Sequence, residues 1–307
     1  MLISSRAVCR AARRSLDRHR TTWIGRVAIV ALAIVAAGVH AALAAAPTAS
    51  TSPAARKDAI KSIPFDKLDA DAKTKISAVL NNTSIYRRLP TQVTQCDPDL
   101  YLFLVQHPVV IVDIWRVMGV SKVALESAGD GVFHANDGAG TTGTVVYCYQ
   151  SHDTHVIYAE GAYDGPVLEK PIRAKCVLLL KSGYMQETDG RYYVTSRLDS
   201  FITFENAGVE LLAKTLQPLV NKSADYNFIE TSAFVGNVSR TAESNHRGVA
   251  KMAGRLSKVD EDVRDRFAEL AVAVATKSAA RQASASKSAK SAAGARRTAS
   301  RQPTNKK

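Results

Sequence analysis

The sequence lacks the short motifs that mark the common catalytic classes. No GxSxG nucleophile elbow, HExxH helix or phosphate-binding P-loop occurs in its 307 residues. Cysteine is scarce as well: Cys9 lies in an N-terminal leader, and Cys96, Cys148 and Cys176 show no CxxC spacing, which argues against a redox pair or a zinc knuckle. Whether two of those three cysteines form a disulfide stays open. We therefore expect no cofactor, and the sequence names no catalytic residue.

Long hydrophobic runs are also missing. The apolar run Val27–Val39 is shorter than the roughly 20 residues that a membrane helix needs. It follows an Arg-rich stretch and precedes Ala42-Leu43-Ala44, which is the order of a secretory signal peptide with an A-x-A cleavage site. We expect residues 1–45 to be a signal peptide cleaved near Ala44, and the mature protein to be exported to the periplasm or the extracellular space. An uncleaved N-terminal membrane anchor and a mitochondrial presequence are the alternatives.

Acidic residues are absent from residues 276–307, which carry nine Lys or Arg and scarcely a large apolar side chain. Such a segment has little to bury, so we expect a disordered tail that associates with an anionic envelope surface. The formal charge of +13 belongs to the two ends, because residues 46–275 hold 25 basic and 27 acidic residues. A nucleic-acid partner is therefore not favoured. Residues 46–62 read as a flexible linker, and residues 63–275 as a single folded domain.

Hydrophobic periodicity and turn residues predict the order of the elements. Asp97-Pro98 is a helix start, and Gly119 is a helix stop in the left-handed region. Pro218 is expected to kink or end the long helix that contains it. The predicted elements are a helix over Phe65–Leu80, a strand over Ile85–Thr94, helices over Pro98–Gln106 and Val109–Met118, an antiparallel meander over Lys122–Phe204, and helices from Val209 to Ala275.

Alternation within the meander predicts which face of each strand is buried. The even-numbered residues of Ile172–Leu180 and Tyr192–Phe204 are mostly apolar and should face the core, whereas Arg197 and Asp199 should face outward. Ser196 and Ser200 are small residues on the otherwise apolar face. They suggest that this face lines a void, although exposure of the strand end is an equal alternative.

The order of a strand, two short helices, a long antiparallel meander and a long helix over about Ile85–Glu243 resembles the START-like, helix-grip (SRPBCC-type) family. The resemblance implies an α+β fold in which a curved antiparallel sheet wraps on a long C-terminal helix, here with extra C-terminal helices. It also implies a cavity for a hydrophobic ligand. The amino-acid sequence of Ser196–Asn206 is similar to segments of exported bacterial proteins of no assigned activity.

The resemblance and the face pattern together imply an exported, non-catalytic protein that binds a hydrophobic small molecule or lipid. One alternative is an envelope-associated structural or interaction protein that acts through its C-terminal helices and basic tail. A more distant alternative is a cyclase- or isomerase-type enzyme that uses Arg197, Asp199 and Glu205 at the cavity mouth. The predicted cavity residues are Tyr158, Cys176, Leu178, Val194, Ser196, Leu198, Ser200, Leu212 and Leu216.

Two short patterns imitate functional motifs. Gly138–Gly143 fits the GxGxxG string, but strand-like residues follow it instead of the helix that would bind a pyrophosphate, so we interpret it as a loop. His152 and His155 have a spacing that suits two metal ligands. Because no third ligand is identifiable, we interpret them as part of a solvated turn and expect no metal site.

Overall fold

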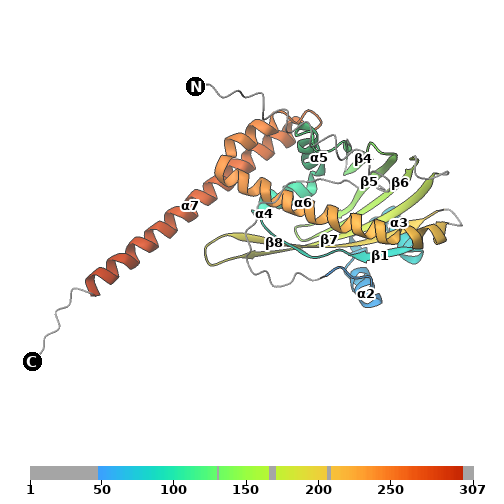
Figure 1. Ribbon diagram of the computed structural model, residues 1–307, viewed down its shortest axis with the longest axis horizontal. Helices are drawn as coiled ribbons and strands as arrows, with labels where there is room; N and C mark the ends of the chain where they lie inside the picture. Colours follow the sequence, from blue (N-terminus) through green and yellow to red (C-terminus); the bar gives the residue numbers. More distant parts are fainter. Residues whose placement is uncertain (1–47, 130, 166–170, 206–208, 300–307) are drawn as a thin grey trace, which may run out of the picture.

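The computed structural model describes residues 48–299 apart from 130, 166–170 and 206–208, and it describes no side chains at 209–216, 218, 219 and 287–299. These residues form an α+β fold in which an open, eight-stranded antiparallel sheet has helices on both faces (Figure 1). The predicted signal peptide lies outside the described residues. The elements are α2 (Pro53–Lys61), η2 (Phe65–Lys67), α3 (Ala70–Asn81), β1 (Ile85–Arg88), β2 (Gln92–Gln95), α4 (Pro98–Gln106), α5 (Pro108–Val117), β3 (Ala124–Gly129), β4 (Val132–Asn136), β5 (Thr141–Gln150), β6 (Thr154–Tyr163), β7 (Ile172–Gln186), β8 (Tyr192–Phe204), α6 (Val209–Ala253) and α7 (Glu261–Ala299).

The sheet has the strand order β1-β8-β7-β6-β5-β4-β3, and β2 pairs with the same edge of β8 as β1. Ile85 lies opposite Ile202, and Val93 lies opposite Thr195. The single strand predicted for this region is therefore two strands. Pro90 lies between them, and because proline has no N–H to donate it interrupts the ladder with β8.

The two short helices confirm the sequence prediction. Asp97 caps α4, since its carboxylate accepts hydrogen bonds from the backbone N–H groups of Asp99 and Leu100. Pro108 opens α5, and Gly119 follows the end of α5 with φ of 69°. Among the described residues, no single helix is long and apolar enough to cross a membrane, and α4 with α5, bent by 86°, passes that test as a pair.

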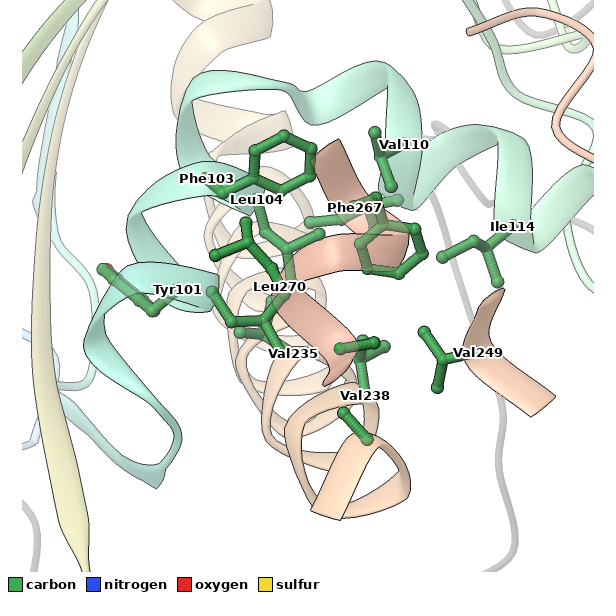
Figure 2. Close-up of a cluster of buried hydrophobic side chains, with 14 of the residues drawn as sticks. Tyr101, Phe103, Leu104, Val110, Ile114, Val235, Val238, Val249, Phe267 and Leu270 are labelled. Atoms are coloured by element: carbon green, nitrogen blue, oxygen red, sulfur yellow. The ribbon is translucent and has the colours of Figure 1, made fainter. Parts of the chain in front are cut away.

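One hydrophobic core lies between the sheet and helices α4, α5, α6 and α7. Its side chains converge from all four helices (Figure 2). Leu100, Leu104 and Phe267 are fully buried, and the rings of Phe103 and Phe267 stack with centroids 6.0 Å apart. This packing joins the C-terminal helices to the sheet domain.

A second core lies on the opposite face of the sheet, under α2 and α3. Ile76 and Val79 of α3 are fully buried, as are the sheet residues that they cover: Val156, Val177, Leu179 and Phe201. The odd-numbered residues of β8 were predicted to face outward, and this prediction was wrong, since Asp199 and Phe201 are fully buried. Alternation identifies one apolar face, but helices cover both faces of these strands.

The predicted flexible linker over residues 46–62 contains helix α2, so this prediction was also wrong. Ser52 caps the helix by accepting a hydrogen bond from the backbone N–H of Ala55. Ala59 is fully buried in the core that α3 and the sheet form. One small buried face is enough to hold a short helix whose composition is otherwise typical of a linker.

Helix α6 continues through Pro218, where a kink or an end was predicted, and leaves helical geometry at Asn245 (φ −147°, ψ 55°). Helix α7 then packs along α6. Lys277 Nζ lies 2.8 Å from carboxylate oxygens of both Asp97 and Asp99, and Arg281 lies 2.8 Å from Glu243. These ion pairs fix the first half of α7 to the body.

The second half of α7 differs from the disordered tail expected from the sequence. The helix runs to Ala299 and extends away from the rest of the chain (Figure 1). Alanine, lysine and arginine are strong helix formers, so the segment keeps helical geometry even though it has few apolar side chains to pack. Residues 300–307 lie outside the described residues.

Candidate functional site

The two faces of the central strands differ in how completely they are covered. Val177, Leu179 and Phe201 face α3 and are fully buried, whereas several apolar side chains on the opposite face are only partly buried. The partly exposed set, called the apolar face below, consists of Cys176, Leu178 and Leu180 on β7 with Leu198 and Ile202 on β8. Cross-strand pairing places Cys176 beside Ile202 and Leu180 beside Leu198, so these side chains form one continuous surface.

The structure brings most of the predicted cavity residues to one face of the sheet. Cys176, Leu178, Val194, Ser196, Leu198 and Ser200 all lie on the side of α4 and α6. Tyr158 lies on the opposite face under α3, where its hydroxyl donates a hydrogen bond to Glu160 at 2.7 Å, so its prediction was wrong. Leu212 and Leu216 belong to α6, and their side chains lie outside the described residues.

The void expected near Ser196 is filled. The hydroxyl of Tyr101 on α4 hydrogen-bonds Ser182 Oγ at 2.9 Å and Ser196 Oγ at 2.8 Å. Figure 2 shows Tyr101 on α4 at the edge of the hydrophobic cluster nearest the strands. Val194 is fully buried in the same core. The serines are small because a tyrosine hydroxyl reaches them, so this end of the sheet is solid.

At the other end of the same face the apolar side chains are only partly buried, and Cys176 is the most enclosed of them. Cys176 Sγ lies 3.7 Å from Ser200 Oγ, and burial raises the pKa of the Cys176 thiol to about 11. A protonated thiol is a poor nucleophile, so Cys176 contributes apolar surface to this face. No charged side chain occurs among the residues that alternate on this face along β7 from Ala174 and along β8 to Phe204.

Beside the apolar face, β5, β6 and β7 contribute a row of very small residues. Gly143, Gly161 and Ala174 lie next to one another across three strands. A Cβ atom added at Gly161 would lie 2.5 Å from the carbonyl oxygen of Thr142, so the close approach of the two strands requires glycine there. Because these residues have small side chains or none, the sheet surface next to the leucines lies close to the backbone.

Helix α6 stands over the β1 and β2 edge of this face. The guanidinium of Arg87 on β1 pairs with both carboxylate oxygens of Asp225, with Nε 2.7 Å from Oδ1. The sheet contacts of α6 are with β2, β1 and β8. Phe228 is half-buried and Ile229 is exposed on this part of the helix. The helix is thus anchored along one edge, next to the half-buried leucines.

His155 occupies a position that the sequence pattern did not reveal. It is fully buried on β6 instead of lying in a solvated turn, and its ring is 6.4 Å from that of Tyr147. Neither ring nitrogen has a hydrogen-bond partner among the described residues, and burial lowers the pKa of His155 to about 4. His152 stays in the turn, with its ring against Tyr184. No group of three potential metal ligands occurs within the described part of the chain.

The charged residues of the enzyme alternative do not lie together beside the apolar face. Asp199 was expected to face outward, but it is fully buried on the α2 side of the sheet. It accepts hydrogen bonds from Tyr86 Oη and Arg88 Nε, both at 2.7 Å, and Arg197 lies 3.4 Å away. Glu205 pairs with Lys175 at 2.6 Å, which lowers the pKa of the Glu205 carboxyl. These charges therefore act as structural ion pairs.

No family model matches the chain, and no curated protein matches it. The solved structures that match include the crystal structure of the Mll3558 protein from Rhizobium loti. That protein is 15% identical, the match covers 45% of this chain and 97% of the other, and the TM-score is 0.24. This structural similarity is too weak to indicate a function.

Proposed function

We propose that this protein is an exported, non-catalytic binding protein for a lipid-like ligand that lies on the apolar face. The supporting observation is the contrast between the two faces of β7 and β8: Val177 and Leu179 are fully buried, whereas Leu178 and Leu180 between them remain partly exposed. A contiguous apolar surface that a fold leaves open is commonly a binding surface.

The arrangement of α6 beside the sheet supports a binding mode of the helix-grip kind. The ligand would lie between the apolar face and the first half of α6. The small residues Gly143, Gly161 and Ala174 would leave room for it above the sheet. Export would place the protein in a compartment where it meets envelope lipids.

The chemistry of the face favours an uncharged acyl or sterol-like ligand. Its residues offer leucine and isoleucine carbon, a protonated thiol at Cys176 and the hydroxyl of Ser200. The guanidinium of Arg87 at the edge of this face is already paired with Asp225, so a ligand carboxylate laid against these groups would lose its hydration without gaining a free cation as a partner. A charged head group would therefore have to remain in solvent.

Replacing Leu178 by tryptophan is expected to fill the face and to weaken ligand binding by about tenfold or more. The measurement is the fluorescence titration of cis-parinaric acid, supported by native mass spectrometry after exposure to a lipid extract. Met185→Trp is the matched control, because Met185 lies on the same strand and is 58% exposed. Equal binding by the two variants, or no binding by the natural protein, would contradict the proposal.

A second function is favoured by the second half of α7, which extends from the body without a single acidic residue. We propose that it holds the protein near an anionic surface by charge alone.

Replacing Lys287, Lys290, Arg296 and Arg297 by glutamine is expected to abolish co-sedimentation with phosphatidylglycerol vesicles. The natural protein should bind these vesicles at low salt, release them at high salt and ignore phosphatidylcholine vesicles. Salt-independent binding, or binding by the glutamine variant, would rule this out.

A further inference from the structure

A pocket of about 470 Å³ lies away from the apolar face, where α4, α5, the β3–β4 hairpin, β5 and the α6–α7 connection meet. This volume is within the roughly 300–1,000 Å³ that small-molecule sites occupy. The pocket is distinct from the apolar face, because no residue of β7 or β8 is among its described lining residues.

One wall of the pocket is apolar. It consists of Val109, Phe133, Val259 and Val263, which belong to or pack against the hydrophobic core of Figure 2. Gly129 contributes to the opposite side with φ of 85°, and no atom lies within 4 Å of the place where its Cβ would be. The pocket therefore borders the edge of the core, since Val109, Phe133 and Val259 are each more than nine-tenths buried, and no side chain from Gly129 narrows it.

The remaining lining is polar and has unused hydrogen-bonding capacity. Gln106 and His107 are partly exposed and Gln150 is exposed, and none of these three side chains forms a hydrogen bond to another described residue. Burial lowers the pKa of His107, against the opposing influence of Asp262, so the imidazole is neutral at neutral pH. Two carboxamides and a neutral imidazole can both donate and accept.

The charged groups of the lining supply no net charge for an ionic ligand. Lys258 Nζ forms an ion pair with Glu126 at 3.0 Å. Asp260 follows Lys258 by two residues in the chain. A carboxylate ligand would have to compete with Glu126 and approach Asp260. The lining is thus suited to a neutral molecule with donors and acceptors at its edge.

A separate observation points to the same place. His155, fully buried and with both nitrogens unpartnered, lies directly opposite Gln150 in the β5–β6 register. The ring of Tyr147 contacts both His155 and the pocket residue Phe133. Buried polar groups in native proteins nearly always have a partner. His155 does not itself line the pocket, but its strand neighbour Gln150 does, so the unpartnered imidazole lies one cross-strand position behind the lining.

We propose that this pocket binds a small, neutral, planar molecule, of the phenolic or heteroaromatic amide class. The ring of such a ligand lies against Phe133 and Val109, and its edge exchanges hydrogen bonds with Gln106, His107 and Gln150. The site is independent of the apolar face and goes beyond the function proposed above.

The test uses 4-hydroxybenzamide as the neutral probe and 4-hydroxybenzoate as its anionic counterpart. Ligand-observed saturation-transfer NMR on the full chain is expected to detect the amide and to show at least about tenfold weaker binding of the benzoate. The amide should also shift the ring signals of His107. Gln150→Trp, which fills the pocket, and His107→Phe, which removes the imidazole, should each abolish the signal.

Glu187→Trp, an exposed position on the β7–β8 turn, is the control and should bind the amide as the natural protein does. Thermal unfolding of each variant distinguishes lost binding from lost folding. Binding that survives in both pocket variants, tighter binding of the benzoate, or no binding of either probe would overturn the proposal. Displacement of cis-parinaric acid by 4-hydroxybenzamide would show that the two sites are not independent.

Discussion

Asp199→Ala is expected to lower the free energy of unfolding by about 3–5 kcal/mol, because it breaks a buried ion pair by removing one partner. Asp199 is fully buried and accepts hydrogen bonds from Tyr86 and Arg88. Without it, the Arg88 guanidinium keeps Asp58 as a partner but loses the carboxylate that its Nε faces. Urea denaturation followed by circular dichroism measures the effect.

The same variant should loosen α2 from the sheet. Arg88 connects Asp199 to α2, since its Nη2 donates hydrogen bonds to the carbonyl oxygen of Ala55 and to Asp58. Amide hydrogen exchange over Pro53–Lys61 should therefore become faster in Asp199→Ala. Asp189→Ala is the control, because Asp189 and Arg191 form an exposed pair whose loss should change stability by less than about 1 kcal/mol. An Asp199→Ala variant as stable as this control would show that the buried cluster is not structural.

His155→Leu is expected to stabilise the protein at pH 7 and to flatten the fall of its stability in acid. Leucine has a similar volume and removes two buried nitrogens that have no partner, which should gain about 1–3 kcal/mol. The neighbouring residues suit this change, because Leu180 lies opposite position 155 on β7. Denaturant titrations at a series of pH values measure both effects.

The direction of the pH effect follows from the pKa values. The pKa of His155 falls from its ordinary value of 6.5 to about 4 in the folded protein. Between these values the unfolded chain binds a proton that the folded chain does not, so stability decreases as the pH falls and is unaffected above pH 6.5. The decrease amounts to about 3 kcal/mol by pH 4. Carboxylates also titrate in this range. The test is therefore the difference between the free energies of unfolding of His155→Leu and of the natural protein at each pH.

His134→Gln is the matched control for this comparison, because His134 is exposed on β4 of the same sheet. Its stability curve should run parallel to that of the natural protein from pH 7 to pH 4. If His155→Leu also ran parallel, His155 would have a partner in solution that keeps its pKa near the ordinary value.

Local chemistry made the helix boundaries and the meander predictable from the sequence. The Asp97 cap, Pro108 at the start of α5 and Gly119 after its end act within a few residues of the features that they determine. Glycine and aspartate turns separate strands of alternating residues in the same local way. These signals require no knowledge of what packs against the element.

The coverage of the sheet and the details of the site could not be predicted in this way. Asp199 is buried because Tyr86, 113 residues earlier in the chain, donates to it. Ser196 lines no void because Tyr101 reaches it from α4, 95 residues away. Alternation along a strand indicates which residues share a face, but it does not indicate which helix covers that face. For this reason the six predicted residues of β7 and β8 do share one face, but alternation did not indicate that Val194, Ser196 and Ser200 would be buried while the leucines stay partly exposed.

The position of β1 and β2 beside β8 also determines when the N-terminal part of the chain can fold during synthesis. Ile85 pairs with Ile202, and α3 covers residues of β6, β7 and β8, so helices α2 and α3 cannot complete their packing until β8 has been synthesised. Closing so long a stretch of chain is slow compared with the formation of local hairpins. Hairpins β3 to β6 can form earlier, with the α3-facing side of β6 still bare. Until β8 has been synthesised, the apolar side chains Val156, Val177 and Leu179 therefore lack part of the core that buries them in the finished fold.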